Sequence, residues 1–181
     1  MNKRSLMTTL VVTVITMVAW GQTLAADDVR VFLFAGQSNM EGADTNVDEV
    51  GRHRPFEGAI EPQEDVLYSY NLGRDRKSDV WTALGPVDGM FGPEITFARS
   101  LKTHVGYPIA IIKDAWGGTT LVNDWDPGGG DEKSKKLYSR LINQVHERLA
   151  ELKAQGKSYR IEAMMWHQGE NDMFHREGKL T

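Results

Sequence analysis

Cysteine is absent from all 181 residues of the sequence. A chain without cysteine has no disulfide framework, so its stability has to come from a hydrophobic core. The length is sufficient for one such core, and hydrophobic residues make up 40% of the chain. We therefore expect one globular domain.

Basic runs and nucleotide- or metal-binding motifs are also missing. The densest basic segment is 133–136, which we interpret as the solvated start of a helix, and the formal net charge is −4. An acidic chain without basic runs repels phosphate backbones, so no nucleic-acid partner is expected. There is no GxxxxGK[ST] loop, and Asp44, Asp48 and Glu49 lack histidine partners at HExxH-like spacing. We predict neither a metal nor a cofactor.

The first 26 residues differ in character from the rest. Lys3 and Arg4 precede a largely apolar stretch, 6–19, and Leu24-Ala25-Ala26 provides the small residues of a cleavage site. A membrane-spanning helix needs about 20 apolar residues, and this stretch is shorter and interrupted by threonines, although an uncleaved anchor is the alternative. We predict a signal peptide over 1–26, a domain over 27–181, and a mature protein that is periplasmic or secreted and free of the membrane.

Three apolar runs are typical of buried strands, at 29–34, 109–115 and 161–166. A helix is predicted to start at Gly92-Pro93-Glu94, because apolar residues recur at helical spacing after it. A second, amphipathic helix is predicted over about 133–154. Alternating strands and helices predict a parallel sheet with helices packed on it, an α/β fold. The irregular stretch 41–90 contains only two possible short strands, 66–70 and 80–84.

Each apolar run leads into a polar or glycine-rich cluster. Ser38 follows the first run, with Gly36 two residues earlier, which suits a sharp strand-to-helix turn that exposes a nucleophile. An ordinary loop serine is the alternative for this segment taken alone. Gly117 and Gly118 follow the second run, where paired glycines can turn N–H groups toward a developing negative charge. Because the carboxyl ends of parallel strands share one edge, we expect these residues to meet the cluster 168–172.

Three strings carry a family resemblance: Phe-Ala-Gly-Gln-Ser-Asn-Met at 34–40, Ala-Trp-Gly-Gly-Thr-Thr-Leu at 115–121, and Trp-His-Gln-Gly-Glu-Asn-Asp at 166–172. With these three strings in this order, the chain resembles the sialate O-acetylesterase and acetylxylan esterase branch of the SGNH hydrolase superfamily. The resemblance covers nearly the whole sequence after residue 26. The resemblance implies a flavodoxin-like, three-layer α/β/α fold with a parallel sheet. It also implies a serine carboxylic-ester hydrolase that acts on acetylated carbohydrate, sialic acid or xylan-like.

The resemblance also assigns roles to residues. Ser38 matches the nucleophile, and its N–H and that of Gly118 match the backbone donors of the oxyanion hole. Gln168 matches the side-chain donor, and Asn171 is the alternative because Gly-x-Asn-Asp is the pattern of the wider superfamily. A substrate pocket is expected to include Gln37, Asn39, Trp125 and Glu170, although Trp125 suits a core position equally well.

The family pattern also includes an Asp-x-x-His block near the carboxyl terminus, which supplies the general base. This block has no clear counterpart in the sequence. The five histidines are His53, His104, His146, His167 and His175. Only His175 follows an aspartate, Asp172, at the right spacing, and Asp172 already belongs to the third string, so this pair is a weak assignment. We therefore expect a domain incomplete at its C-terminus and an esterase that is weak or inactive in this form. The alternative is a catalytically dead carbohydrate-binding remnant.

Overall fold

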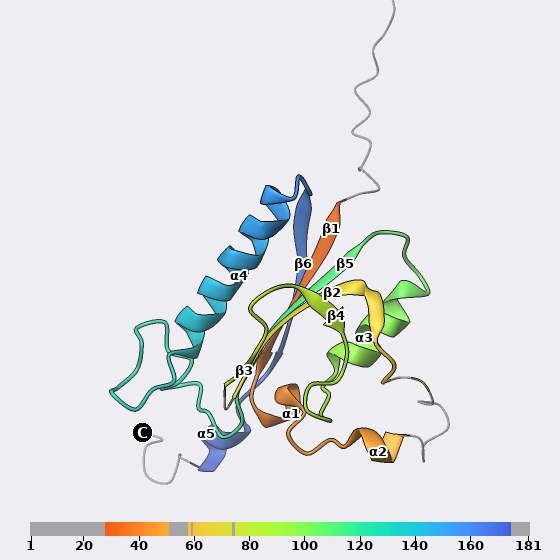
Figure 1. Ribbon diagram of the computed structural model, residues 1–181. Helices are drawn as coiled ribbons and strands as arrows, with labels where there is room; N and C mark the ends of the chain where they lie inside the picture. Colours follow the sequence, from red (N-terminus) through yellow and green to blue (C-terminus); the bar gives the residue numbers. More distant parts are fainter. Residues whose placement is uncertain (1–27, 51–57, 59, 74, 175–181) are drawn as a thin grey trace, which may run out of the picture.

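The computed structural model describes residues 28–50, 58, 60–73 and 75–174 (Figure 1). The predicted signal peptide, His53 and His175 lie outside these described residues.

A mixed, mostly parallel sheet forms the centre of the described structure. Its strand order is β3-β2-β5-β1-β6, with β4 also pairing with β2. The parallel strands are β1 (Val29–Gly36), β2 (Gln63–Leu72), β5 (Ile109–Ala115) and β6 (Tyr159–His167). The short strands β3 (Arg76–Lys77) and β4 (Thr82–Leu84) run antiparallel to β2.

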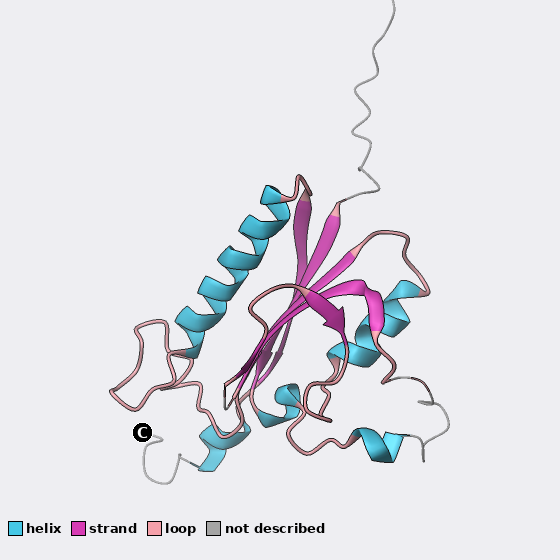
Figure 2. Ribbon diagram, in the orientation of Figure 1, coloured by secondary structure: helices cyan, strands magenta, loops and turns pink. Residues whose placement is uncertain are grey.

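Helices cover both faces of this sheet, as Figure 2 shows. The helix α3 (Glu94–Lys102) packs on one face and α4 (Leu137–Ala154) on the other. Three short helices, α1 (Ser38–Glu41), α2 (Val47–Val50) and α5 (Glu170–Phe174), lie toward the carboxyl ends of the strands (Figure 1). The predicted three-layer α/β/α fold is therefore confirmed.

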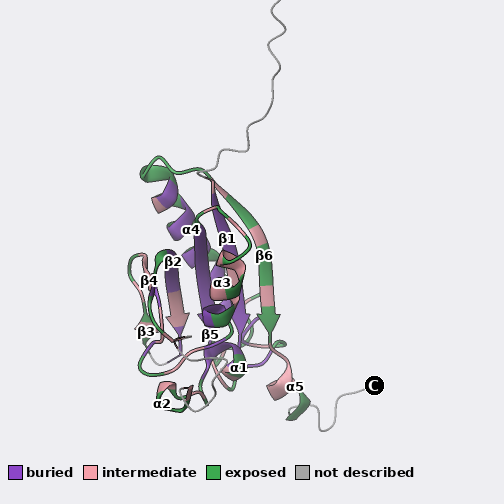
Figure 3. Cartoon of the chain, turned by 90° about the vertical axis from the view of Figure 1, so that its right-hand side faces the viewer, coloured by how far each residue is buried: buried purple, intermediate pink, exposed green. Residues whose placement is uncertain are grey.

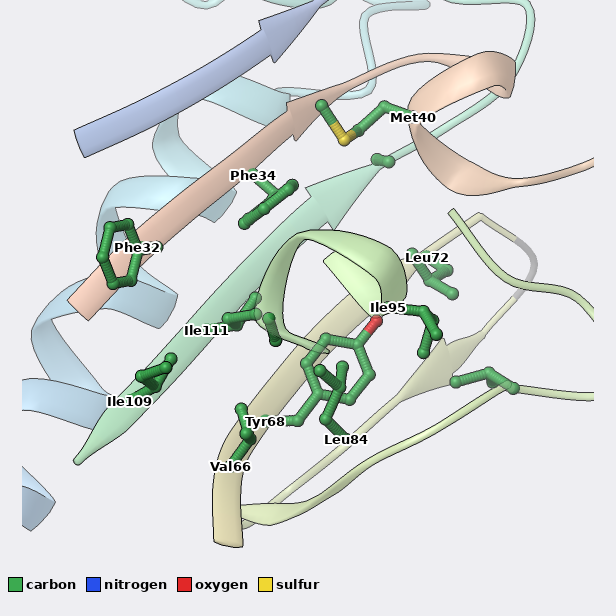
Figure 4. Close-up of a cluster of buried hydrophobic side chains, with 13 residues drawn as sticks. Phe32, Phe34, Met40, Val66, Tyr68, Leu72, Leu84, Ile95, Ile109 and Ile111 are labelled. Carbon is green, nitrogen blue, oxygen red and sulfur yellow. The ribbon is translucent and has the colours of Figure 1, made fainter. Parts of the chain in front are cut away.

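Strand alternation divides the core into two halves. Successive side chains of a strand point to opposite faces, so Phe32 and Phe34 of β1 join the half beneath α3, while Val31 and Ala35 join the half beneath α4. Figure 4 shows the first half, where Phe32, Phe34, Ile109 and Ile111 line up along β1 and β5. This double coverage explains why these central strands read as continuous apolar runs.

The start of α4 differs from the prediction. The helix begins at Leu137 and not near Lys133, because two aspartates capture the preceding backbone in a turn. The N–H of Lys133 donates to Asp131 Oδ1 at 2.8 Å and that of Lys135 to Asp124 Oδ1 at 2.9 Å. These bonds offer the backbone an alternative to the helical pattern.

The strand β6 is less buried than its apolar sequence suggested. Within the described residues it pairs with β1 alone, so its other edge has no strand beside it. Figure 3 shows β6 largely exposed, and Ile161, Met164 and Trp166 are 45%, 46% and 42% exposed. The apolar run predicted the strand correctly and its burial wrongly, because burial depends on neighbours that the run itself does not specify.

Candidate functional site

Ser38 begins α1, and only Gln37 separates it from the end of β1. Gly36 closes the strand so tightly against β6 that a Cβ atom at this position would lie 2.0 Å from the carbonyl oxygen of His167. The next N–H, that of Gln37, donates to the same carbonyl at 3.0 Å. Glycine is thus required at position 36 because the backbones of β1 and β6 meet directly beneath the serine.

The glycine turn after β5 lies beside Ser38. The N–H of Trp116 donates to the carbonyl of Gly36 at 3.1 Å, which joins the ends of β5 and β1. A Cβ atom on Gly117 would lie 3.2 Å from Ser38 Cβ, and Gly118 has a φ of 73°, which glycine adopts without strain. In the described part of the chain, neither the N–H of Gly118 nor Ser38 Oγ has a hydrogen-bond partner. Both groups are therefore available to a ligand.

The third cluster is hydrogen-bonded to the glycine turn. Gln168 Nε2 donates to the carbonyl of Thr119 at 2.9 Å and to Asp172 Oδ2 at 3.1 Å, and Asn171 Nδ2 donates to the carbonyl of Gly118 at 2.8 Å. The Asp172 carboxylate accepts the N–H of Leu121 at 2.8 and 2.9 Å. Both side chains proposed from the family pattern as oxyanion donors thus hold the turn in this structure, and their catalytic role stays a prediction.

Side chains of the first and third clusters also meet. Asn39 Nδ2 donates to Glu170 Oε1 at 2.5 Å, and His167 Nε2 lies 3.3 Å from the same oxygen. Gln37 is buried, and its Oε1 accepts the N–H of Asn171 at 3.4 Å. These contacts join two segments that are about 130 residues apart in the sequence.

Trp125 was expected to line the substrate pocket, and the structure places it in the core instead. It is only 3% exposed, belongs to the core half beneath α4, and packs edge-to-face against Trp166 with ring centroids 4.8 Å apart. A side chain this buried has no face left for a sugar ring. We conclude that Trp125 is a packing residue in this structure.

A cavity of about 550 Å³ opens beside Ser38. It is lined by Ser38, Glu41, Ala43, Asp44, Arg76, Asp88, Met90, Trp116, Gly117 and Gly118. The cavity thus joins the serine to the glycine turn, and its lining also contains ionised side chains that the sequence analysis did not assign.

Two of these, Glu41 and Arg76, form an ion pair at the edge of the cavity. Beneath them lies a second pair, in which Lys113 Nζ is 2.7 Å from Glu94 Oε2 and both side chains are almost fully buried. Burial lowers the pKa of Lys113, and the neighbouring Glu94 carboxylate opposes this shift. The sequence analysis assigned none of these four residues to the site. Glu94 was identified only as part of a helix start, and Lys113 was a signal because it is a charged residue inside the apolar run of β5.

The described histidines do not reach the serine. His104 Nδ1 bonds the carbonyl of Ser100 within its own turn, His146 is exposed on α4, and His167 pairs with Glu170. Among the residues that the structure describes, no group of histidine and acidic side chains suits a metal ion, and no helix has the length and apolarity to cross a membrane.

Asp172→Ala is expected to lower the free energy of unfolding by about 1–2 kcal/mol, since hydrogen bonds to charged groups contribute roughly 1.5–3 kcal/mol and this carboxylate is partly exposed. Urea denaturation measures the change. Asp79→Ala is the matched control, because Asp79 is 81% exposed and its carboxylate pairs, among the described residues, with the exposed Lys77, so its effect should stay below about 0.5 kcal/mol. Equal effects of the two substitutions would show that Asp172 does not anchor the turn.

A family model, described as carbohydrate esterase, sialic acid-specific acetylesterase, matches residues 28–179. No curated protein matches the sequence.

Solved structures that are similar to this chain include those of XAC1771 and NanS. XAC1771, a carbohydrate acetylesterase from Xanthomonas citri, has 22% identity and a TM-score of 0.47, with 78% of this chain and 32% of that chain covered. NanS has 15% identity and a TM-score of 0.51, with 81% of this chain and 55% of that chain covered. The chain therefore spans about a third and about half of the lengths of these proteins, and its likeness to NanS concerns the fold alone.

Proposed function

The chain belongs to the carbohydrate esterase family of sialic acid-specific acetylesterases, and from this we propose that it hydrolyses O-acetyl esters of sialic acid or xylan-like sugars through an acyl-serine. One observation carries the proposal: Ser38 and Gly118, whose Oγ and N–H have no partner among the described residues, line the same cavity. A nucleophile and an oxyanion donor in one cavity are what acyl transfer requires.

In the proposed reaction Ser38 Oγ attacks the acetyl carbonyl carbon, and its proton passes to a general base. The carbonyl oxygen becomes negative and accepts the N–H groups of Ser38 and Gly118, with Gln168 or Asn171 as a third donor. Collapse of this intermediate breaks the bond to the sugar oxygen, which takes the proton and leaves. Water then releases acetate from the serine. Each hole donor contributes roughly 3–4 kcal/mol to stabilisation of the transition state.

We further propose that turnover by this 181-residue chain is weak. A general base typically contributes 10²- to 10⁴-fold, and no described side chain makes a hydrogen bond with Ser38 Oγ to provide it. The base would then be a group outside the described residues. His175, which follows Asp172 at the spacing of the family pattern, is a weak candidate. We also retain the proposal that residues 1–26 direct export to the periplasm or beyond.

Acetate release tests the proposed function. The purified chain is incubated with O-acetylated sialic acid, with acetylated xylan oligomers and with p-nitrophenyl acetate, beside Ser38→Ala. We expect slow hydrolysis of at least one sugar ester that Ser38→Ala reduces by 10²-fold or more, as loss of a covalent nucleophile requires. Hydrolysis unaffected by the substitution would exclude the acyl-serine route. Sugar binding without any hydrolysis would favour the carbohydrate-binding remnant.

A further inference from the structure

The Glu41 carboxylate connects the serine helix to the glycine turn. Glu41 ends α1, three residues after Ser38, and is 5% exposed. Its Oε2 accepts the N–H of Gly117 at 2.6 Å, while its Oε1 pairs with Arg76 Nη2. The short helix that presents the serine is therefore tied through one side chain to the residue before Gly118.

This contact holds the backbone of the glycine turn that follows β5. Gly117 and Gly118 are consecutive, and glycine has the largest conformational freedom of any residue. The Gly118 N–H lies in the peptide plane between Gly117 and Gly118, and the φ and ψ angles of Gly117 set how this plane is turned relative to the preceding one, which carries the Gly117 N–H. An oxyanion hole is effective only when its donors are already oriented before the charge develops. An acceptor that holds the N–H of Gly117 restricts this orientation.

Arg76 makes the burial of the Glu41 carboxylate tolerable. A buried carboxylate is stable only when it is paired and hydrogen-bonded. The Arg76 guanidinium is itself held in place, with Nε donating to the carbonyl of Gly73 at 3.0 Å and Nη1 directed to Met90 Sδ at 3.6 Å. The pair thus anchors the glycine turn to the loop between β2 and β3 as well as to α1.

We propose that Glu41 is a positioning residue for ester hydrolysis, which holds the N–H of Gly117 so that the N–H of Gly118 faces the acyl oxygen. This inference rests on the proposed function, and Glu41 itself touches no reacting atom. Its removal should lower kcat and leave KM nearly unchanged, because the donor that it orients acts on the charge of the transition state.

The first test measures the contact without activity. Amide hydrogen exchange is followed by NMR on the chain labelled with ¹⁵N-glycine, in Glu41→Gln, Glu41→Ala and the control Glu64→Gln, an exposed residue of β2. Loss of a hydrogen bond to a charged acceptor should speed exchange of the Gly117 amide about 10- to 100-fold in Glu41→Ala. Glu41→Gln keeps an acceptor oxygen of the same shape and should lie between. An unchanged exchange rate in both variants would overturn the proposal.

The second test is kinetic, with p-nitrophenyl acetate as substrate. We expect kcat to fall about 10- to 100-fold in Glu41→Ala with KM within twofold, and Glu41→Gln to recover part of the loss, as for an oriented oxyanion donor. A KM increase at constant kcat would overturn the proposal. Circular dichroism checks folding, and the isosteric Glu41→Gln remains informative where Glu41→Ala is unfolded. If the wild-type chain does not hydrolyse the ester, the proposed function is contradicted but the contact between Glu41 and Gly117 is not. In that case the exchange rate of the Gly117 amide tests the contact.

Discussion

Gly36→Ala is expected to lower the free energy of unfolding by about 3 kcal/mol or more, at the upper end of the cost of overpacking. The added methyl group would lie 2.0 Å from the His167 carbonyl oxygen and 2.8 Å from Met40 Cβ. The first neighbour is backbone and cannot move without separating β1 from β6. Chemical denaturation measures the loss, and the reactivity of Ser38 should fall with it, since the same junction supports the serine turn.

Gly106→Ala provides the matched control. A Cβ atom at Gly106 meets no other atom within 4 Å, so the substitution should change the free energy of unfolding by less than about 1 kcal/mol. If Gly36→Ala were as stable as Gly106→Ala, the close approach of the strand ends would be wrong, and with it the placement of Ser38.

Lys113→Met is expected to cost about 3–5 kcal/mol of folding stability, because it leaves the buried Glu94 carboxylate without its cation. The double substitution Lys113→Met with Glu94→Leu should recover much of this loss, since apolar residues of similar volume often replace a buried ion pair at little cost. Urea denaturation of the two single variants and the double variant gives the coupling between the residues. A control, Lys77→Met in an exposed pair, should change stability by less than about 0.5 kcal/mol.

The same lysine predicts a pH dependence. Because burial lowers the pKa of Lys113 below its usual 10.5, the unfolded chain binds more protons than the folded one between the two values. The contribution of Lys113 to stability should therefore rise with pH as 10.5 is approached, and Lys113→Met should lack this rise. Additive effects of the two single substitutions, or identical pH profiles, would contradict the buried pair.

The apolar runs and their glycines predicted most of the architecture. Residues 109–115 read as a covered strand because β5 is buried on both faces, and Gly36 marked the turn where two backbones meet. The start of α4 was wrong by four residues, since helix periodicity says nothing of the aspartates that hold the preceding turn.

The site was predicted less completely than the fold. Convergence of Ser38, Gly118 and the cluster 168–172 follows from parallel strands that end at one edge, and the structure brings these segments together. The tie between Glu41 and Gly117 joins residues 76 positions apart through a side chain, and no local pattern encodes such a pair. The burial of Trp125 likewise follows from its place in the core half beneath α4, among residues that are distant in the sequence.

The most direct measurement is a crystal structure of the chain after prolonged reaction with phenylmethanesulfonyl fluoride, which sulfonylates reactive serines. We expect a single adduct on Ser38, with one sulfonyl oxygen within hydrogen-bond distance of the Gly118 N–H and the phenyl group in the adjoining cavity. An adduct on another residue, or sulfonyl oxygens directed away from Gly118, would contradict the assignment of Ser38 as nucleophile and Gly118 as oxyanion donor.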